Sequence, residues 1–261
     1  MSEAGRLALV TGASTGIGAA LALGLAEAGF RLALGARRPD RLAEIAERAR
    51  ERGAVVHADR LDVADAASVE RFFEGSERAL GVADAVINNA GASRPAALHE
   101  YEVDWLETEV ATNFLGPILV SRRALLSLRR EGRSGDLVFI GSDATRRPRP
   151  QQVIYGAAKA GIENLADGLA MELEGTGIRV TKVRLGPTVS EFGAEWDLDR
   201  IGERVAYWRD YGLRDARLLG HMLPTETVAA AVIDAVNRPA GVWIDTIEIQ
   251  PAAPRKDEAD E

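Results

Sequence analysis

The sequence predicts an α/β fold, a doubly wound and mostly parallel sheet of seven strands with helices on both faces. Short β-rich runs alternate with longer helical patterns almost to the end of the chain. In the helical stretches, apolar residues recur at intervals of three and four, and the stretches end at glycine. Repeated strand–helix–strand units imply parallel strands with right-handed crossovers, which place helices on both faces of the sheet.

The expected strands follow the chain in a regular order. They cover residues 6–11, 31–36, 54–58, 84–88, 136–142, 178–185 and 242–249. Helical stretches lie between them, such as PDRLAEIAERARERG after the second strand and IYGAAKAGIENLADGLAMELEG before the sixth. No linker divides the sequence, so we expect a single domain over residues 1–250. We expect the last stretch, 251–261, to be a flexible acidic tail.

Composition limits the possible partners. The 261 residues are 46% hydrophobic and 28% charged, as in an ordinary soluble protein with a large core. A formal net charge of −8 argues against nucleic acid or an anionic membrane as the main partner. The N-terminus does not resemble a signal peptide, and no apolar run approaches bilayer length. We therefore expect a cytoplasmic protein.

The scarcity of metal-binding side chains narrows the chemistry. The sequence has no cysteine, which excludes disulfides, thiolate metal sites and a cysteine nucleophile. Its three histidines, His57, His99 and His221, are scattered without metal-ligand spacing. No metal site is expected.

Three glycines stand between the first expected strand and the first expected helix, in the stretch TGASTGIG. They allow a tight turn, and the helix that begins near Ile17 directs its free N–H groups and positive dipole end at whatever lies there. A pyrophosphate suits that position, although glycine-rich turns also serve packing alone. The cradle would comprise Gly12, Ser14, Thr15, Gly16, Ile17 and Gly18.

Tyr155 and Lys159 are four positions apart on an expected helix, so their side chains share one face. A phenol with its ordinary pKa near 10 is almost fully protonated at neutral pH, so it cannot act as a base there. A nearby ammonium stabilises the phenolate and lowers that pKa, so such a tyrosine can exchange a proton with a carbonyl or an alcohol. The alternative is one surface lysine and one packed tyrosine. Ser142 favours the chemical interpretation because it ends an expected strand, where open α/β sheets bind ligands.

Four motifs occur in a set order: TGxxxGxG, NNAG at 88–91, Ser142, and YGAAK at 155–159. Together they resemble the short-chain dehydrogenase/reductase family, over residues 6–249 approximately. The resemblance implies a Rossmann-like fold and a catalytic set of four residues. Tyr155 would be the acid/base, Lys159 would tune the pKa of Tyr155 and hold the ribose, Ser142 would orient the substrate, and Asn113 would anchor a proton-relaying water. Asn113 could instead make a hydrogen bond that kinks a long helix.

The resemblance also implies a cofactor preference. Ala36 stands where an NAD-selecting acid would lie, and Arg37 and Arg38 follow it, as in the NADP-preferring branch. NADP(H) is therefore expected, with NAD(H) possible, although arginines after a strand are otherwise ordinary solvated residues. Leu185 replaces a proline that the family more often has after the sixth strand. The remaining cofactor contacts would be Asp62 and Val63 at the adenine, Asn89, Ala90 and Gly91 near the ribose, and Gly186, Thr188 and Ser190 at the nicotinamide.

The substrate side carries weaker signals. Residues 191–223 hold Phe192, Trp196, Tyr207, Trp208 and Tyr211, which form either a lid (about 188–223) over a medium-sized, partly apolar substrate or a packed helical hairpin. The run RRPRP at 146–150 could attract an acidic group, but a solvated or subunit-contact role is favoured. Small residues along the Tyr155 helix predict a homo-oligomer, a dimer or a tetramer.

The sequence as a whole predicts an NADP(H)-dependent oxidoreductase that interconverts a carbonyl and a secondary alcohol. Dehydration or epimerisation on the same scaffold is an alternative within enzymes, and it usually goes with altered motifs. A rival from another class is a regulatory protein that binds dinucleotide without turning it over. That interpretation usually goes with loss of the Tyr or the Lys, and both are present here.

Overall fold

The computed structural model describes residues 5–189, 207 and 222–252. Its seven strands form one sheet in the order β3-β2-β1-β4-β5-β6-β7, and every neighbouring pair is parallel. The predicted α/β class and strand number are thus confirmed. The strands are β1 (Leu7–Thr11), β2 (Arg31–Ala36), β3 (Val56–Arg60), β4 (Ala85–Asn88), β5 (Gly135–Ile140), β6 (Ile178–Leu185) and β7 (Thr246–Ile249).

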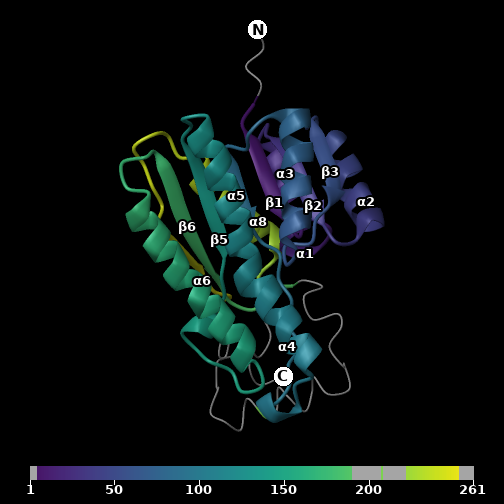
Figure 1. The fold of residues 1–261 in the computed structure, drawn as a ribbon, viewed down its shortest axis with the longest axis vertical. Helices are drawn as coiled ribbons and strands as arrows, with labels where there is room; N and C mark the ends of the chain where they lie inside the picture. The colour runs from purple at the N-terminus through teal and green to yellow at the C-terminus, as the bar shows by residue number, and fades with distance from the viewer. Residues whose placement is uncertain (1–4, 190–206, 208–221, 253–261) are drawn as a thin grey trace.

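Helices cover both faces of this sheet (Figure 1). Helices α3, α5 and α6 lie on the face toward the viewer, with α4 below α5, and α1, α2 and α8 lie behind the sheet. The described helices are α1 (Gly16–Glu27), α2 (Pro39–Arg50), α3 (Ala66–Leu80), α4 (Val103–Val110), α5 (Gly116–Arg130), α6 (Val153–Glu172) and α8 (Thr225–Val236). A π-helical turn, η2 (Ala111–Leu115), joins α4 to α5, and short 3₁₀ turns form η1 (Leu98–Glu100) and η3 (Asp143–Thr145).

Alternate residues of each strand supply two separate cores. On β1, Ala8 and Val10 pack toward α1, α2 and α8, whereas Leu7 and Leu9 pack toward α3, α5 and α6. This follows from the period of two along a strand, and it explains why the central strands β1, β2, β4 and β5 are mostly apolar and buried on both faces. The edge strands β3 and β7 are partly exposed. The centre of the sheet is therefore a firm support for the residues at its strand ends.

Three predicted strands differ from the observed ones by two residues or more. The third is observed at Val56–Arg60 and not at 54–58. The seventh begins at Thr246 and not at residue 242. Trp243 and Ile244, which precede it, are joined to β6 by side-chain hydrogen bonds and not by a backbone ladder. The Trp243 indole donates to the Val180 carbonyl (2.8 Å), and the Thr181 hydroxyl donates to the Ile244 carbonyl (2.7 Å). The fifth ends at Ile140, so Ser142 lies just beyond the strand.

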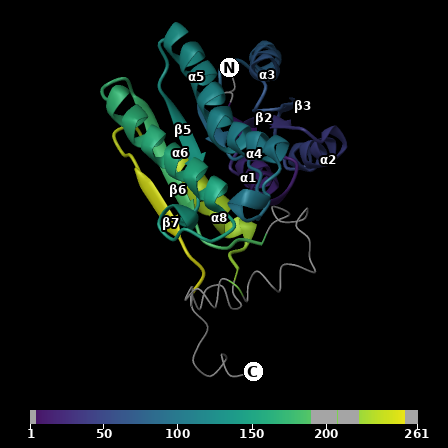
Figure 2. The same cartoon turned by 60° about the horizontal axis from the view of Figure 1, so that its bottom comes forward.

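The carboxyl ends of the parallel strands meet at one edge of the sheet, seen from below in Figure 2. The strand order reverses between β1 and β4, which is where open sheets of this kind bind ligands. Most of the predicted lid, with Ser190, Phe192, Trp196, Trp208 and Tyr211, lies outside the described residues, as does the tail after residue 252. Tyr207 is described, and its side chain is exposed.

No helix in the described part of the chain combines the length and the apolar character needed to cross a bilayer.

Candidate active site

Close backbone packing requires glycine at several positions of the turn after β1. Gly12 has φ +67°, a conformation that favours glycine, and a Cβ there would lie 2.9 Å from the Cα of Ala90. A Cβ on Gly18 would lie 2.2 Å from the Gly12 carbonyl oxygen. Gly16 also has positive φ, +54°. The same glycines therefore pack closely on neighbouring backbone and keep the turn open, so the packing interpretation and the phosphate-binding interpretation of the motif are compatible.

Helix α1 begins at Gly16 and presents an uncapped N-terminus at this turn. Thr15 is the N-cap residue, and its side chain makes no capping hydrogen bond. The first turn contains no acidic residue, so its amide groups and the positive end of the helix dipole are available to an anion. The buried Ser14 and the half-buried Ile17 complete the predicted cradle. These residues fit a dinucleotide pyrophosphate.

The cradle is tied to the end of the neighbouring strand β4. The Asn89 amide donates to the carbonyls of Thr11 (2.9 Å) and Gly12 (3.3 Å). In return, the Thr11 hydroxyl accepts from the backbone N–H groups of Asn89 and Ala90, both at 3.0 Å. The NNAG motif thus fixes the glycine turn across the gap where the strand order reverses.

An arginine reaches the same turn from the end of β2. Arg38 donates from Nη2 to the Thr15 hydroxyl at 2.8 Å, while Ala36 is buried and Arg37 is exposed. The predicted pair is therefore adjacent to the cradle, and Arg38 is the member that contacts it. This contact brings a positive charge to the place where the second strand ends.

The other predicted cofactor residues lie along the same edge. Asp62 accepts from the Ala64 N–H (3.1 Å) and Val63 is buried, so this loop after β3 has a defined shape. Gly91 is exposed beside Ala90. After β6, Gly186 packs so closely on the residues that follow β7 that a Cβ would lie 2.4 Å from Gln250 Oε1. The Thr188 hydroxyl donates to the Gly186 carbonyl (3.0 Å).

Ser142, Tyr155 and Lys159 come together beyond the end of β5, and all three are buried. A hydrogen bond links Ser142 to the phenol of Tyr155. The ammonium nitrogen of Lys159 lies 5.8 Å from the centre of the Tyr155 ring and donates to the Ile140 carbonyl at 2.8 Å. Residues 142, 155 and 159 therefore form one cluster, as the spacing on α6 predicts.

The charges of this cluster differ from the sequence expectation. Burial raises the pKa of Tyr155 to about 12, against the hydrogen bond from Ser142 and the positive charge of Arg149, which lower it. Burial lowers the pKa of Lys159 to about 8. The expected lowering of the Tyr155 pKa by Lys159 is not seen in the chain alone, because burial disfavours the charged form of both groups.

Asn113 is fully buried in the π-helical turn η2. Its Nδ2 donates to the carbonyls of Ala92 (2.5 Å) and Glu109 (2.9 Å), and its Oδ1 accepts from the Ala92 N–H (3.2 Å). The structural alternative for Asn113, a hydrogen bond at an irregularity of a long helix, is therefore observed. The same bonds also fix the loop that follows NNAG against the α4–α5 helix.

Two ionisable elements beside Tyr155 were not anticipated. Arg149, from the run RRPRP, donates to both carboxylate oxygens of Asp143 at 2.9 Å, and both side chains are largely buried. Its neighbours Arg146 and Arg147 are exposed, so the run divides between an internal ion pair and a solvated surface. The second element is the buried carboxyl of Glu109 on α4. Its spacing, one helical turn before Asn113, is the only signal in the sequence that it faces the same way.

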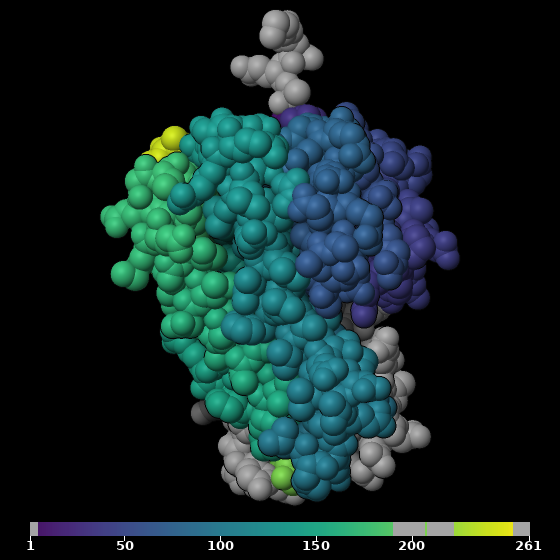
Figure 3. Space-filling view, viewed as in Figure 1, coloured from purple at the N-terminus to yellow at the C-terminus, as the bar shows by residue number. Residues whose placement is uncertain are grey.

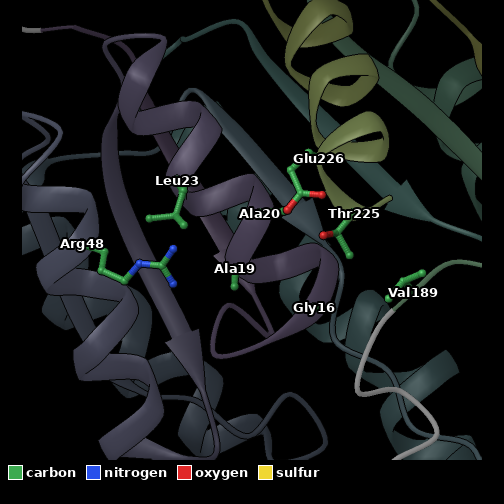
Figure 4. Close-up of a pocket in the computed structure, with 8 residues that line it drawn as sticks. All are labelled: Gly16, Ala19, Ala20, Leu23, Arg48, Val189, Thr225 and Glu226. Atoms are coloured by element: carbon green, nitrogen blue, oxygen red, sulfur yellow. The ribbon is translucent and has the colours of Figure 1, made fainter. Parts of the chain in front are cut away.

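A hollow of about 450 Å³ lies between α1, α2 and the start of α8 (Figure 4). Its walls come from α1, from Arg48 on α2, from Val189 after β6 and from the start of α8, and Gly16 is the cradle residue that lines it. Ser142, Tyr155 and Lys159 do not line it. The cluster of Ser142, Tyr155 and Lys159 is therefore separate from this hollow.

A family model described as short chain dehydrogenase matches residues 6–200. The chain belongs to the short-chain dehydrogenase family. Sulfoacetaldehyde reductase 2 of Chromohalobacter salexigens is 34% identical to it over 247 residues, or 94% of each chain. The predicted family and enzyme class are confirmed: the protein is an NAD(P)-dependent oxidoreductase of the short-chain type.

Solved dehydrogenase structures share the fold over nearly the whole chain. An alcohol dehydrogenase from the archaeon Thermococcus sibiricus, complexed with 5-hydroxy-NADP, has a TM-score of 0.80 and 28% identity and covers 96% of this chain and 98% of its own. The closed form of a serine dehydrogenase complexed with NADP+ has a TM-score of 0.82 and 27% identity, covering 94% and 95%.

Proposed function

We propose that this short-chain dehydrogenase is an NADP(H)-dependent oxidoreductase that interconverts a carbonyl and a secondary alcohol on a medium-sized, partly apolar substrate. The observation that carries the proposal is the buried cluster of Ser142, Tyr155 and Lys159, which lies beyond the end of β5 at the same edge of the sheet as the uncapped N-terminus of α1. The names of the relatives, a reductase and two dehydrogenases, support a reaction of this class.

Each side chain of the cluster has a distinct task in the proposal. The Ser142 hydroxyl and the Tyr155 phenol hold the substrate oxygen, and Tyr155 gives it a proton in reduction or takes one in oxidation. Lys159 supplies a positive charge on the same helix face that stabilises the phenolate. Asn113 fixes the adjacent loop and, by family resemblance, a relaying water. Bound NADP(H) supplies or accepts the hydride.

Two observations support NADP(H) over NAD(H). Arg38 lies 2.8 Å from the Thr15 hydroxyl at the edge of the cradle, where it would pair with a 2′-phosphate. The two solved relatives described above are NADP-type complexes. The cradle residues, Asp62, Val63, Asn89, Ala90, Gly91, Gly186, Thr188 and Ser190 would hold the rest of the dinucleotide.

The decisive test is oxidation of NADPH against a panel of carbonyl compounds, with Tyr155→Phe as the variant. Loss of the proton donor should lower the rate by about 10²- to 10⁴-fold while the bound NADPH keeps its enhanced fluorescence. A non-catalytic dinucleotide sensor would bind NADPH equally well but show no turnover in the wild type. Full activity in the Phe variant would overturn the proposed role of Tyr155.

We also propose that the protein is a homo-oligomer assembled through α5 and α6, which lie side by side in teal and green on the face shown in Figure 3. A groove of about 340 Å³ runs between them. Leu126 is 51% exposed there, and Met171 at the end of α6 is 79% exposed. Of the small residues on α6, Ala157, Ala160 and Gly168 are exposed, but Gly161 packs against Phe114 within the chain.

A further inference from the structure

Glu109 is a buried acid that the proposed reaction does not use. It lies on α4, its side chain is fully enclosed, and its carboxyl oxygen Oε1 has no hydrogen-bond partner. Its other oxygen, Oε2, contacts the Tyr101 hydroxyl. An enclosed carboxylate with one free oxygen is costly, because burial penalises the charged form.

The hydrogen-bond inventory around Tyr101 indicates which form is present. The Tyr101 oxygen lies within hydrogen-bond distance of both Glu109 Oε2 and the Arg94 carbonyl, which is 2.5 Å away. A phenol has one proton, and a backbone carbonyl can only accept. Both contacts are satisfied when Glu109 is protonated and donates to Tyr101, which in turn donates to Arg94. A carboxylate would leave two acceptor oxygens in competition for the one proton.

The balance of burial and polar contacts acts in the same direction. The Tyr101 hydroxyl, the Arg94 backbone and Ser93 favour the charged form of Glu109, but burial outweighs them and raises its pKa. The Arg94 side chain gives no compensation, because it is 54% exposed and lies 3.7 Å from Glu102. The neighbourhood of the carboxyl is therefore short of positive charge.

Glu109 is electrostatically coupled to Tyr155. Helix α4 packs on α6, and a negative charge on Glu109 raises the pKa of the Tyr155 phenol. The other charged groups that face Tyr155 are the Asp143–Arg149 pair, whose charges oppose each other, and Lys159 above its ring. A change of charge on Glu109 is therefore not cancelled by a partner of its own.

We propose that Glu109 is a positioning residue for Tyr155, held as a neutral acid at neutral pH, whose ionisation at higher pH opposes formation of the tyrosinate. This inference rests on the proposed acid–base role of Tyr155. In the neutral state, Glu109 joins α4 to the 94–101 segment through Tyr101 and places no charge beside the reacting phenol. Once ionised, it reduces the fraction of Tyr155 that is present as the tyrosinate able to accept the proton of the alcohol.

Two measurements test the inference, with Glu109→Gln as the variant and Glu107→Gln as the matched control. Glu107 lies on the same helix and is exposed. The first is infrared spectroscopy of the whole protein at neutral pH. A carbonyl band of a protonated carboxyl should be present in the wild type and in Glu107→Gln, should be missing in Glu109→Gln, and should disappear from the wild type as the pH rises. A wild-type spectrum without that band, or a band that survives in Glu109→Gln, would overturn the inference.

The second measurement is the pH profile of alcohol oxidation by NADP+. Because Gln never ionises, the rising limb of kcat/KM should move to lower pH by about one unit in Glu109→Gln and stay in place in Glu107→Gln. An unmoved limb in Glu109→Gln would refute the coupling to Tyr155. Full turnover by Tyr155→Phe would instead refute the proposed function, and the infrared result would stand apart from it.

Discussion

The ammonium nitrogen of Lys159 lies 5.8 Å from the centre of the Tyr155 ring, and burial acts against the charged form of both side chains. The two residues are four positions apart on α6 and so share one face. The Lys159 ammonium is held by one hydrogen bond, to the Ile140 carbonyl. A charge placed this way lowers folding stability, and in the proposed reaction it would stabilise the phenolate.

Replacing Lys159 by Met should therefore raise the free energy of unfolding by about 1–3 kcal/mol at neutral pH. The unfolded chain keeps the lysine proton up to the ordinary pKa of 10.5, whereas the folded chain releases it at about 8. The destabilisation is complete below pH 8 and is lost as the pH rises from 8 to 10.5, so the gain should shrink across that window. Urea unfolding at several pH values measures it. Lys182→Met, which removes an ion-paired lysine, should give no gain, and a pH-independent gain for Lys159→Met would contradict the assignment.

Arg38→Ala should weaken NADPH binding by about 10- to 100-fold and NADH binding little, because a charge-assisted contact with the 2′-phosphate is lost. Arg37→Ala is the matched variant one residue earlier, and its effect should be smaller because Arg38 is the side chain that reaches Thr15. Fluorescence titration with the two reduced cofactors gives both ratios. Equal losses for NADPH and NADH would remove Arg38 from cofactor selection.

Gly18→Ala should destabilise the protein by about 1–3 kcal/mol and weaken dinucleotide binding, because the new Cβ would overlap the Gly12 carbonyl and the Asn89 amide. Gly168→Ala on α6 is the control. Nothing lies within 4 Å of its Cβ position, so the better helix propensity of alanine should add up to about 1 kcal/mol. Thermal unfolding with and without NADPH separates the two effects. A stable Gly18→Ala variant with normal binding would show that the turn does not need this close approach.

Leu126→Glu should shift the protein to a smaller assembly, because it places a charge in the groove between α5 and α6. Val55→Glu, at an equally exposed apolar residue before β3, should leave the assembly unchanged. Light scattering at micromolar concentration distinguishes the species. A wild-type protein that is already monomeric there would refute the proposed oligomer.

The features that sequence predicted best are those encoded by local spacing. The i, i+4 relation of Tyr155 and Lys159 and the glycines of the turn required only helix and turn geometry, and both appear as expected. The parallel sheet that carries them was predicted from the repeated strand–helix–strand pattern, whereas the order of its strands was not predicted. Local rules of this kind survive folding because the buried sheet leaves little freedom to its strand ends.

The features that sequence missed depend on contacts between distant segments. The contact of Arg38 with Thr15 and that of Arg149 with Asp143 require the fold to be known. The position of Glu109 was obscured further, because the π-helical turn at residues 111–115 breaks the ordinary helical period between it and Asn113. The pKa of Tyr155 in the chain alone is raised by burial and not lowered, because spacing does not reveal how deeply two groups are buried.

The bonds between Thr11 and Asn89 have a consequence for how affinity is distributed. They order the cradle during folding, so the loop is already in its binding conformation before the nucleotide arrives. Binding therefore costs little conformational entropy in the loop. Retention of the nucleotide thus depends on residues that brace the loop from behind as much as on those that face the ligand. A variant of this chain could lose cofactor affinity through loss of the hydrogen bonds between Thr11 and Asn89, even if every side chain that contacts the cofactor were unchanged.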